Sequence, residues 1–82
     1  MDMVAAMDGT MPPEMRDRVG MRLRAVREAC GLTVEGLSVR SDIAEFIIRA
    51  IEDGWTQYTF EQLLCLARAL GVPVVEFFGD DE

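Results

Sequence analysis

The chain has 82 residues, half of them apolar, and its 15 acidic residues outnumber its 8 basic ones to give a net charge of −7. All eight basic residues are arginines, and the chain contains no histidine. The lack of lysine and histidine excludes catalytic triads, P-loops and most zinc sites. The length is that of one domain. No stretch approaches the roughly 18 apolar residues of a membrane span, and the N-terminus lacks the basic region of a secretory signal.

The two cysteines, Cys30 and Cys65, do not have a spacing typical of a metal site. We therefore expect free thiols in a reducing cytoplasm, with a disulfide between them as the less favoured alternative. The free thiols predict a cytoplasmic protein, and the composition predicts that it is not an enzyme. It also predicts that the protein has no metal site, no small-molecule cofactor and no membrane segment.

Residues 1–12 are rich in methionine and show no lasting hydrophobic period, so we predict a flexible N-terminal arm. Pro13 suits the first turn of a helix. Apolar residues then recur every three or four positions, which predicts a helix from Pro13 to Cys30 that ends at Gly31. The apolar stripe of this helix consists of Met15, Val19, Leu23, Val26 and Cys30. Its other faces carry the only locally basic stretch of the chain.

A helix, a tight turn and a second helix are predicted next. Thr33 is a favourable N-cap for a helix over residues 34–40. The segment Ser41-Asp42-Ile43 then breaks the helix, because aspartate tolerates the left-handed backbone conformation that such a turn requires. A third helix is expected over residues 44–53, and Gly54 ends it. This succession is typical of a helix-turn-helix motif.

Two further helices are predicted in the C-terminal part. Thr59, with Gln62 three residues later, has the pattern of a capping box for a helix over residues 60–70. Gly71 ends that helix. A last short helix is expected over residues 74–78, where its aromatic residues can close the open end of the bundle.

A family pattern extends over residues 19–78, made up of Gly20, Arg24, Arg27, Gly31-Leu32-Thr33, Leu37-Ser38, Ile43, Ile48, Ile51-Glu52-Asp53-Gly54, Thr59-Phe60-Glu61-Gln62-Leu63-Leu64, Leu66-Ala67-Arg68-Ala69-Leu70-Gly71-Val72 and Glu76-Phe77-Phe78. With these residues the chain resembles the Cro/CI-repressor-like (XRE) helix-turn-helix family. The resemblance implies an all-α, five-helix, lambda-repressor-like bundle over residues 13–79, between the arm at residues 1–12 and an acidic tail at residues 80–82. It also implies an internal ion pair between Arg27 and Glu52.

The resemblance implies a transcriptional regulator that binds double-stranded DNA as a homodimer. The helix over residues 44–53 of each subunit would then enter the major groove. The residues expected to face the bases are Glu45, Phe46 and Arg49, and Arg49 is the one best suited to guanine. The residues expected to contact phosphates are Arg22, Arg24, Thr33 and Arg40.

The surface that should meet DNA departs from the family pattern. Val34 replaces the glutamine that usually begins the second helix, and the third helix opens with Ala44-Glu45-Phe46-Ile47 instead of polar or basic residues. From Thr33 to Trp55, five acidic residues oppose two arginines, a local net charge of −3. Negative charge on this surface disfavours contacts with phosphates.

These departures favour an alternative function, that of a protein–protein interaction module that modulates another regulator or the transcription machinery. Apolar residues near one outward surface are surrounded by acidic side chains, which is typical of a protein interface. The residues expected in this interface are Val34, Phe46, Ile47 and Trp55. The sequence therefore leaves two hypotheses open, a DNA-binding regulator and a module that binds a protein partner.

Overall fold

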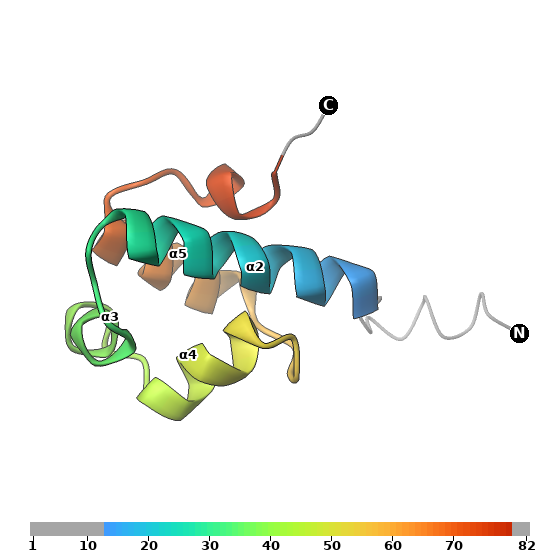
Figure 1. Ribbon diagram of the computed structural model, residues 1–82, viewed down its shortest axis with the longest axis horizontal. Coiled ribbons are helices and arrows are strands. Elements are labelled where there is room, and N and C mark those ends of the chain that lie inside the picture. Colours follow the sequence, from blue (N-terminus) through green and yellow to red (C-terminus); the bar gives the residue numbers. More distant parts are fainter. Residues whose placement is uncertain (1–12, 80–82) are drawn as a thin grey trace, which may run out of the picture.

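The computed structural model describes residues 13–79, which form a helical bundle without β-strands in this part of the chain (Figure 1). Within these residues, four α-helices precede one 3₁₀-helix: α2 (Pro13–Ala29), α3 (Val34–Ser41), α4 (Glu45–Glu52), α5 (Phe60–Leu70) and η1 (Val74–Phe77). None of the described helices is long and apolar enough to cross a bilayer. The arm predicted at residues 1–12 and the acidic tail predicted at residues 80–82 lie outside the described residues.

The all-α helix-turn-helix class predicted from the sequence is confirmed, but the count of five α-helices is wrong. The last element is a 3₁₀-helix of 4 residues. Its backbone N–H groups bond to carbonyls three residues earlier, from Glu76 to Pro73 and from Phe78 to Val75, which is the tighter pattern common in short helices. Cys30 and Cys65 are both free thiols, as expected.

The predicted helix caps are present. The Thr33 hydroxyl accepts a hydrogen bond of 2.9 Å from the Gly36 N–H at the start of α3. Asp42 ends α3 in the left-handed conformation, with φ 64°, so that the chain turns sharply into α4. Thr59 and Gln62 form a reciprocal capping box at the start of α5, with both bonds 3.0 Å long. These caps supply partners for backbone groups that the helices leave unpaired.

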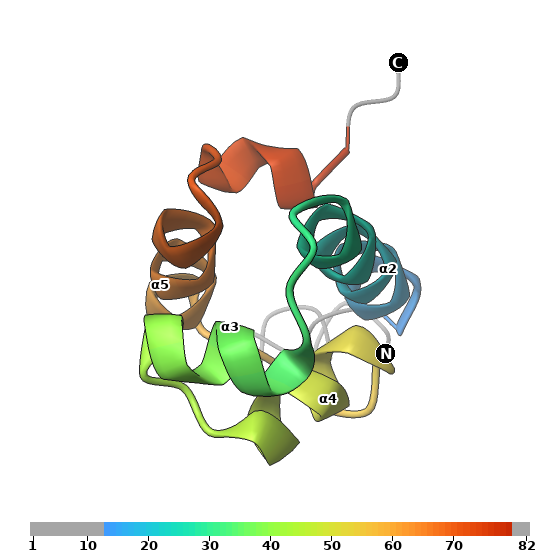
Figure 2. The ribbon, with the colours of Figure 1, turned by 60° about the vertical axis from the view of Figure 1, so that its left-hand side comes forward.

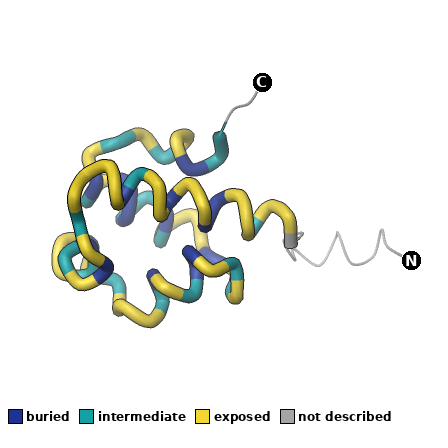
Figure 3. The backbone as a smooth tube through the Cα atoms, in the orientation of Figure 1, coloured by how far each residue is buried: buried dark blue, intermediate teal, exposed yellow. Residues whose placement is uncertain are grey.

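The apolar stripe of α2 is shorter than predicted. Val19 and Leu23, at its middle, are fully buried, and Val26 is partly buried against the core. Met15 and Cys30, at its two ends, are exposed. Figure 3 shows that the N-terminal end of α2, which carries Met15, extends beyond the helices packed against its middle.

The core lies inside a ring of helices (Figure 2). Helix α2 packs on α4, α3 packs on both α4 and α5, and η1 bridges α2 and α5. The largest fully buried side chains come from every one of these elements: Val19, Leu23, Leu37, Ile48, Ile51, Leu63, Leu66 and Phe77. Phe77 therefore closes one end of the core, as predicted for the last helix.

Helices α2 and α4 approach closely at Gly20. A Cβ atom at this position would lie 2.7 Å from the backbone carbonyl oxygen of Glu52 and closer still to that of Ile51. Real side chains do not reach such distances, so only glycine allows α2 to cross the end of α4 here. This contact brings the carboxylate of Glu52 next to the arginines of α2.

A buried ion pair joins α2 to the end of α4. Arg27 donates from Nε to Glu52 Oε2 at 2.7 Å and from Nη2 to Glu52 Oε1 at 3.0 Å. Its Nη1 donates to the Leu32 carbonyl at 2.8 Å. Arg27 and Glu52 are only 9% and 6% exposed, and the hydrogen bond to Glu52 raises the pKa of Arg27. The internal ion pair implied by the family resemblance is confirmed, in a bidentate geometry.

Replacement of Glu52 by glutamine is expected to destabilise the domain by about 3–5 kcal/mol, because it leaves the buried guanidinium of Arg27 without its counter-charge. Urea unfolding followed by circular dichroism measures this loss. Asp53→Asn is the matched control, since Asp53 pairs with Arg24 at 2.8 Å on the surface and its charge should contribute at most about 1 kcal/mol. Equal losses in the two variants would contradict the role of the buried pair.

Candidate nucleic-acid interface

Helices α3 and α4 form the helix-turn-helix unit, and the outer side of α4 carries the three residues predicted to face bases. Ile48 and Ile51 on the inner side of α4 are fully buried or nearly so, whereas Glu45, Phe46 and Arg49 are exposed. Phe46 is 73% exposed. The structure therefore brings these three residues together on the one face of α4 that a groove could receive.

Arg49 is bonded to two carboxylates on this surface. Its Nη2 atom donates to Glu35 Oε2 at 3.2 Å and to Glu45 Oε1 at 3.4 Å. Glu45 lies one turn before Arg49 on α4, a spacing that is visible in the sequence. Glu35 belongs to the first turn of α3. Its contact with Arg49 was not predicted from the sequence, because the contact depends on how α3 lies against α4.

Glu35 is held in its charged form. Its pKa lies below the ordinary value, chiefly because its carboxylate interacts with its own backbone N–H, and further because of the charge of Arg49 and the hydroxyl of Thr33. A carboxylate at the N-terminal end of a helix is also favoured by the helix dipole. At neutral pH, the reader arginine predicted from the sequence thus has two charged acceptors beside it.

The residues predicted to contact phosphates do not form one cluster. Arg24 bonds to Asp53 and Glu52 at the end of α4. It lines a surface hollow together with Arg27 and Arg49, but three acidic residues line the same hollow: Glu28, Glu52 and Asp53. Basic and acidic charges are therefore balanced where α2, α3 and α4 meet.

The other three predicted phosphate contacts lie apart from this hollow or are already engaged. The hydroxyl of Thr33 caps α3, and Nε of Arg22 donates to the Glu76 carbonyl of η1 at 2.8 Å. Arg40 is exposed at the end of α3 and shares a shallow hollow with Arg68 of α5, with no acidic residue among those that line it. Arg68 is a basic neighbour that the sequence analysis missed.

The four residues predicted for a protein interface also separate. Phe46 and Trp55 are 73% and 80% exposed. Val34 is only 8% exposed, so its assignment to the outer surface is wrong. It shares the inner side of α3 with Leu37, because residues three apart on a helix point in similar directions. Ile47 is half-buried and packs against the core.

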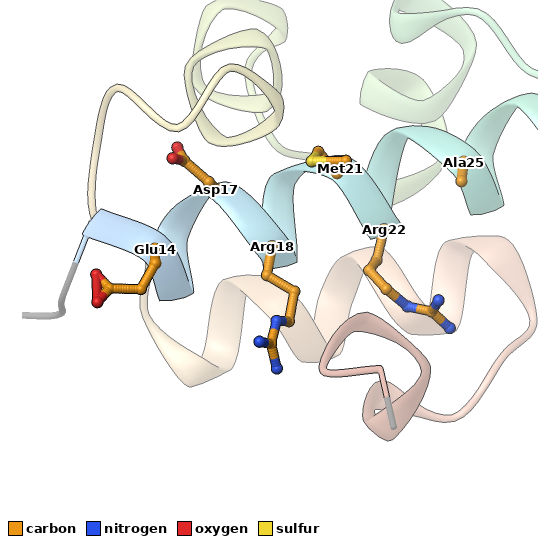
Figure 4. A pocket seen from close by; sticks show the side chains of 6 residues that line it. All are labelled: Glu14, Asp17, Arg18, Met21, Arg22 and Ala25. Carbon is orange, nitrogen blue, oxygen red and sulfur yellow. The ribbon is translucent and has the colours of Figure 1, made fainter. Parts of the chain in front are cut away.

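A further hollow of about 470 Å³ lies on the outer side of α2 and is lined by Glu14, Asp17, Arg18, Met21, Arg22 and Ala25 (Figure 4). It contains no residue of α3 or α4. Residues 13–79 contain no group of acidic or cysteine side chains arranged to hold a metal ion. The helix-turn-helix surface is therefore the stronger candidate for the functional site.

Three solved structures resemble the chain over most of its length. The restriction-modification controller protein C.AhdI from Aeromonas hydrophila is 32% identical, with a TM-score of 0.75, over 77% of this chain and 96% of its own. The DNA-binding domain of BldD is 31% identical, with a TM-score of 0.76, over 84% and 100%. The clp gene regulator ClgR from C. glutamicum is 27% identical, with a TM-score of 0.73, over 77% and 82%.

A family model also matches the chain. The model of the helix-turn-helix domain covers residues 18–77, which include the whole of α3, α4 and α5. No curated protein sequence matches. The family match spans most of the chain, and the structural neighbours share the same arrangement of helices. The chain therefore belongs to the XRE-like helix-turn-helix family.

Proposed function

We propose that the protein is a cytoplasmic transcriptional regulator that binds double-stranded DNA as a homodimer, without catalysis and without a small-molecule cofactor. The observation that carries this proposal is the exposed outer face of α4, with Arg49 at its centre. The chain that bears this face is 31% identical to the DNA-binding domain of BldD, over the full length of that domain. The proposed function is thus located on α4 and the start of α3.

In the proposed complex α4 lies in the major groove and the start of α3 meets the DNA backbone. Arg49 would donate two hydrogen bonds to N7 and O6 of a guanine. Glu45 would accept a hydrogen bond from a cytosine amino group, and Phe46 would contact a thymine methyl group. The buried Arg27–Glu52 pair supports this geometry, because it fixes α4 against α2.

Phosphate contacts in this proposal come from Arg24, Arg40, Thr33 and the backbone N–H groups at the start of α3. They are few for a protein of net charge −7. A dimer doubles their number and places two α4 helices about one turn of DNA apart. Dimerisation therefore strengthens binding, because two linked sets of contacts engage the same duplex.

Titration of the confirmed dimer with a pool of random duplexes at about 50 mM salt, where attraction to phosphates is strong, is expected to show saturable binding. Sequences selected from the bound fraction should share a guanine. Arg49→Ala should lose the preference at that base pair, at a cost of about 1–3 kcal/mol. Fluorescence anisotropy measures the affinity of the wild type and of Arg49→Ala for duplexes that differ at this base pair.

Arg18→Ala is the matched control, since Arg18 is an exposed arginine in the hollow on α2. It removes the same charge and should leave the base preference intact. The proposal fails if the wild-type dimer shows no saturable binding at about 50 mM salt, the condition that favours it most. An unchanged preference in Arg49→Ala would show that another residue reads the guanine.

A second candidate function is favoured by the exposure of Phe46 and Trp55. Large exposed aromatic side chains are frequent anchors of protein interfaces. Arg49 is already paired with Glu35 and Glu45, so the α3–α4 surface around Phe46 carries no free positive charge from Arg49. Such a surface suits a partner with basic and apolar side chains, such as another regulator or a part of the transcription machinery.

Phe46→Asp is expected to abolish capture of such a partner while the helical content stays unchanged, because Phe46 lies on the surface. Immobilised protein and mass spectrometry of the material bound from a lysate of the source cells provide the measurement. Val75→Asp on η1, also exposed, is the control and should retain the partner. Capture of the same partner by Phe46→Asp would argue against this function.

A further inference from the structure

We propose that Glu35 and Glu45 form a carboxylate latch that holds Arg49 in the free protein and lowers its availability to DNA. The inference rests on the proposed DNA-binding function and adds a regulation of the same site. It assigns a role to Glu35, a residue that belongs to neither the predicted base contacts nor the predicted phosphate contacts.

The contacts around Arg49 carry the proposal. Both carboxylates accept from the same atom, Nη2, at 3.2 Å for Glu35 and 3.4 Å for Glu45. They come from different helices, so the latch links the first turn of α3 to the middle of α4. Within residues 13–79, neither carboxylate forms an ion pair with any arginine other than Arg49.

The geometry places the latch in competition with a base. A guanidinium reads guanine with two parallel N–H donors, and Nη2 belongs to the end of Arg49 that must supply them. Nη2 has two N–H groups and both are bonded to carboxylates, so a bidentate contact with guanine has to displace at least one of the two carboxylates. The apparent affinity falls by the fraction of molecules in which Arg49 is released.

Exposure sets the strength of the latch. The side chains of Arg49, Glu35 and Glu45 are 53%, 60% and 46% exposed, and ion pairs in such positions are weak and are screened by salt. The latch can therefore be opened by a good acceptor, unlike the buried pair between Arg27 and Glu52. A weak, exchangeable latch reduces binding by a factor and does not abolish it.

A double-mutant cycle separates a latch from simple repulsion between Glu35 and phosphates. Glu35→Gln keeps the shape of the side chain and removes its charge, and Glu35 is exposed, so the fold should be retained. If the latch acts through Arg49, removal of Glu35 should increase DNA affinity much more in the presence of Arg49 than in the Arg49→Ala background. Repulsion alone would give the same gain in both backgrounds.

The experiment measures binding of labelled duplexes by fluorescence anisotropy for the wild type, Glu35→Gln, Arg49→Ala and the double variant, with circular dichroism as the check on folding. The duplexes are a random pool and the sequences selected from it by the wild type or by Glu35→Gln. We expect Glu35→Gln to raise the affinity for the selected duplex about three- to tenfold at about 50 mM salt, and the gain to shrink as salt rises. In the Arg49→Ala background, most of the gain should disappear.

Glu14→Gln is the control for a change in net charge, because Glu14 is exposed in the hollow on the outer side of α2. It should change the affinity by less than about twofold, since its charge lies away from the α3–α4 surface and is screened. A gain equal to that of Glu35→Gln would attribute the effect to net charge alone and would overturn the latch.

The remaining outcomes also decide the matter. If the wild type binds DNA and Glu35→Gln gives no gain, or an equal gain without Arg49, the latch is overturned while the proposed function stands. If the wild type does not bind at about 50 mM salt and Glu35→Gln does, the effect is larger than a weak, exposed ion pair can supply, so the proposed function of the wild type and the latch both fail. If neither binds, the DNA-binding function itself fails and the latch fails with it.

Discussion

Glu52 ends α4, and its carboxylate is bonded to Arg27 and Arg24 of α2. The contact depends on Gly20, because any side chain there would collide with the backbone at the end of α4. Together they fix the direction of α4 in the bundle. With its inner side packed on the core, α4 can turn only its outer side, which includes Arg49, toward a partner. The same packing also fixes the positions of the other exposed residues of α4.

Ion pairs between arginine and glutamate occur at two places on α4, and they differ in how deeply they are buried. Arg27 and Glu52 are almost completely buried, so loss of either charge leaves the other unpaired in a medium that solvates it poorly. The pairs of Arg49 lie in water and exchange partners easily. An acidic chain can therefore keep Arg49, the proposed base-reading arginine, on its surface, with carboxylates that stabilise the free state and yield to a stronger acceptor.

Local signals in the sequence predicted most of the fold. The caps at Thr33 and Thr59 and the turn at Asp42 depend on a few neighbouring residues, and all three are confirmed. The burial of Val34 was not predicted, because it depends on how α3 sits against the other helices. The contact between Glu35 and Arg49 escaped prediction for the same reason. The contacts of the site residues depend on the distances between helices, and these distances cannot be predicted from local patterns in the sequence.

An NMR titration of the isotopically labelled protein with a selected duplex is the most direct test of whether the outer face of α4 binds DNA. We expect the largest changes in amide chemical shift in α4 and in the first turn of α3, at about 50 mM salt, where phosphate attraction is strong. The side-chain signals of Arg49 should change with them. Changes confined to the outer side of α2, or no changes at a saturating amount of duplex, would contradict DNA binding by α4.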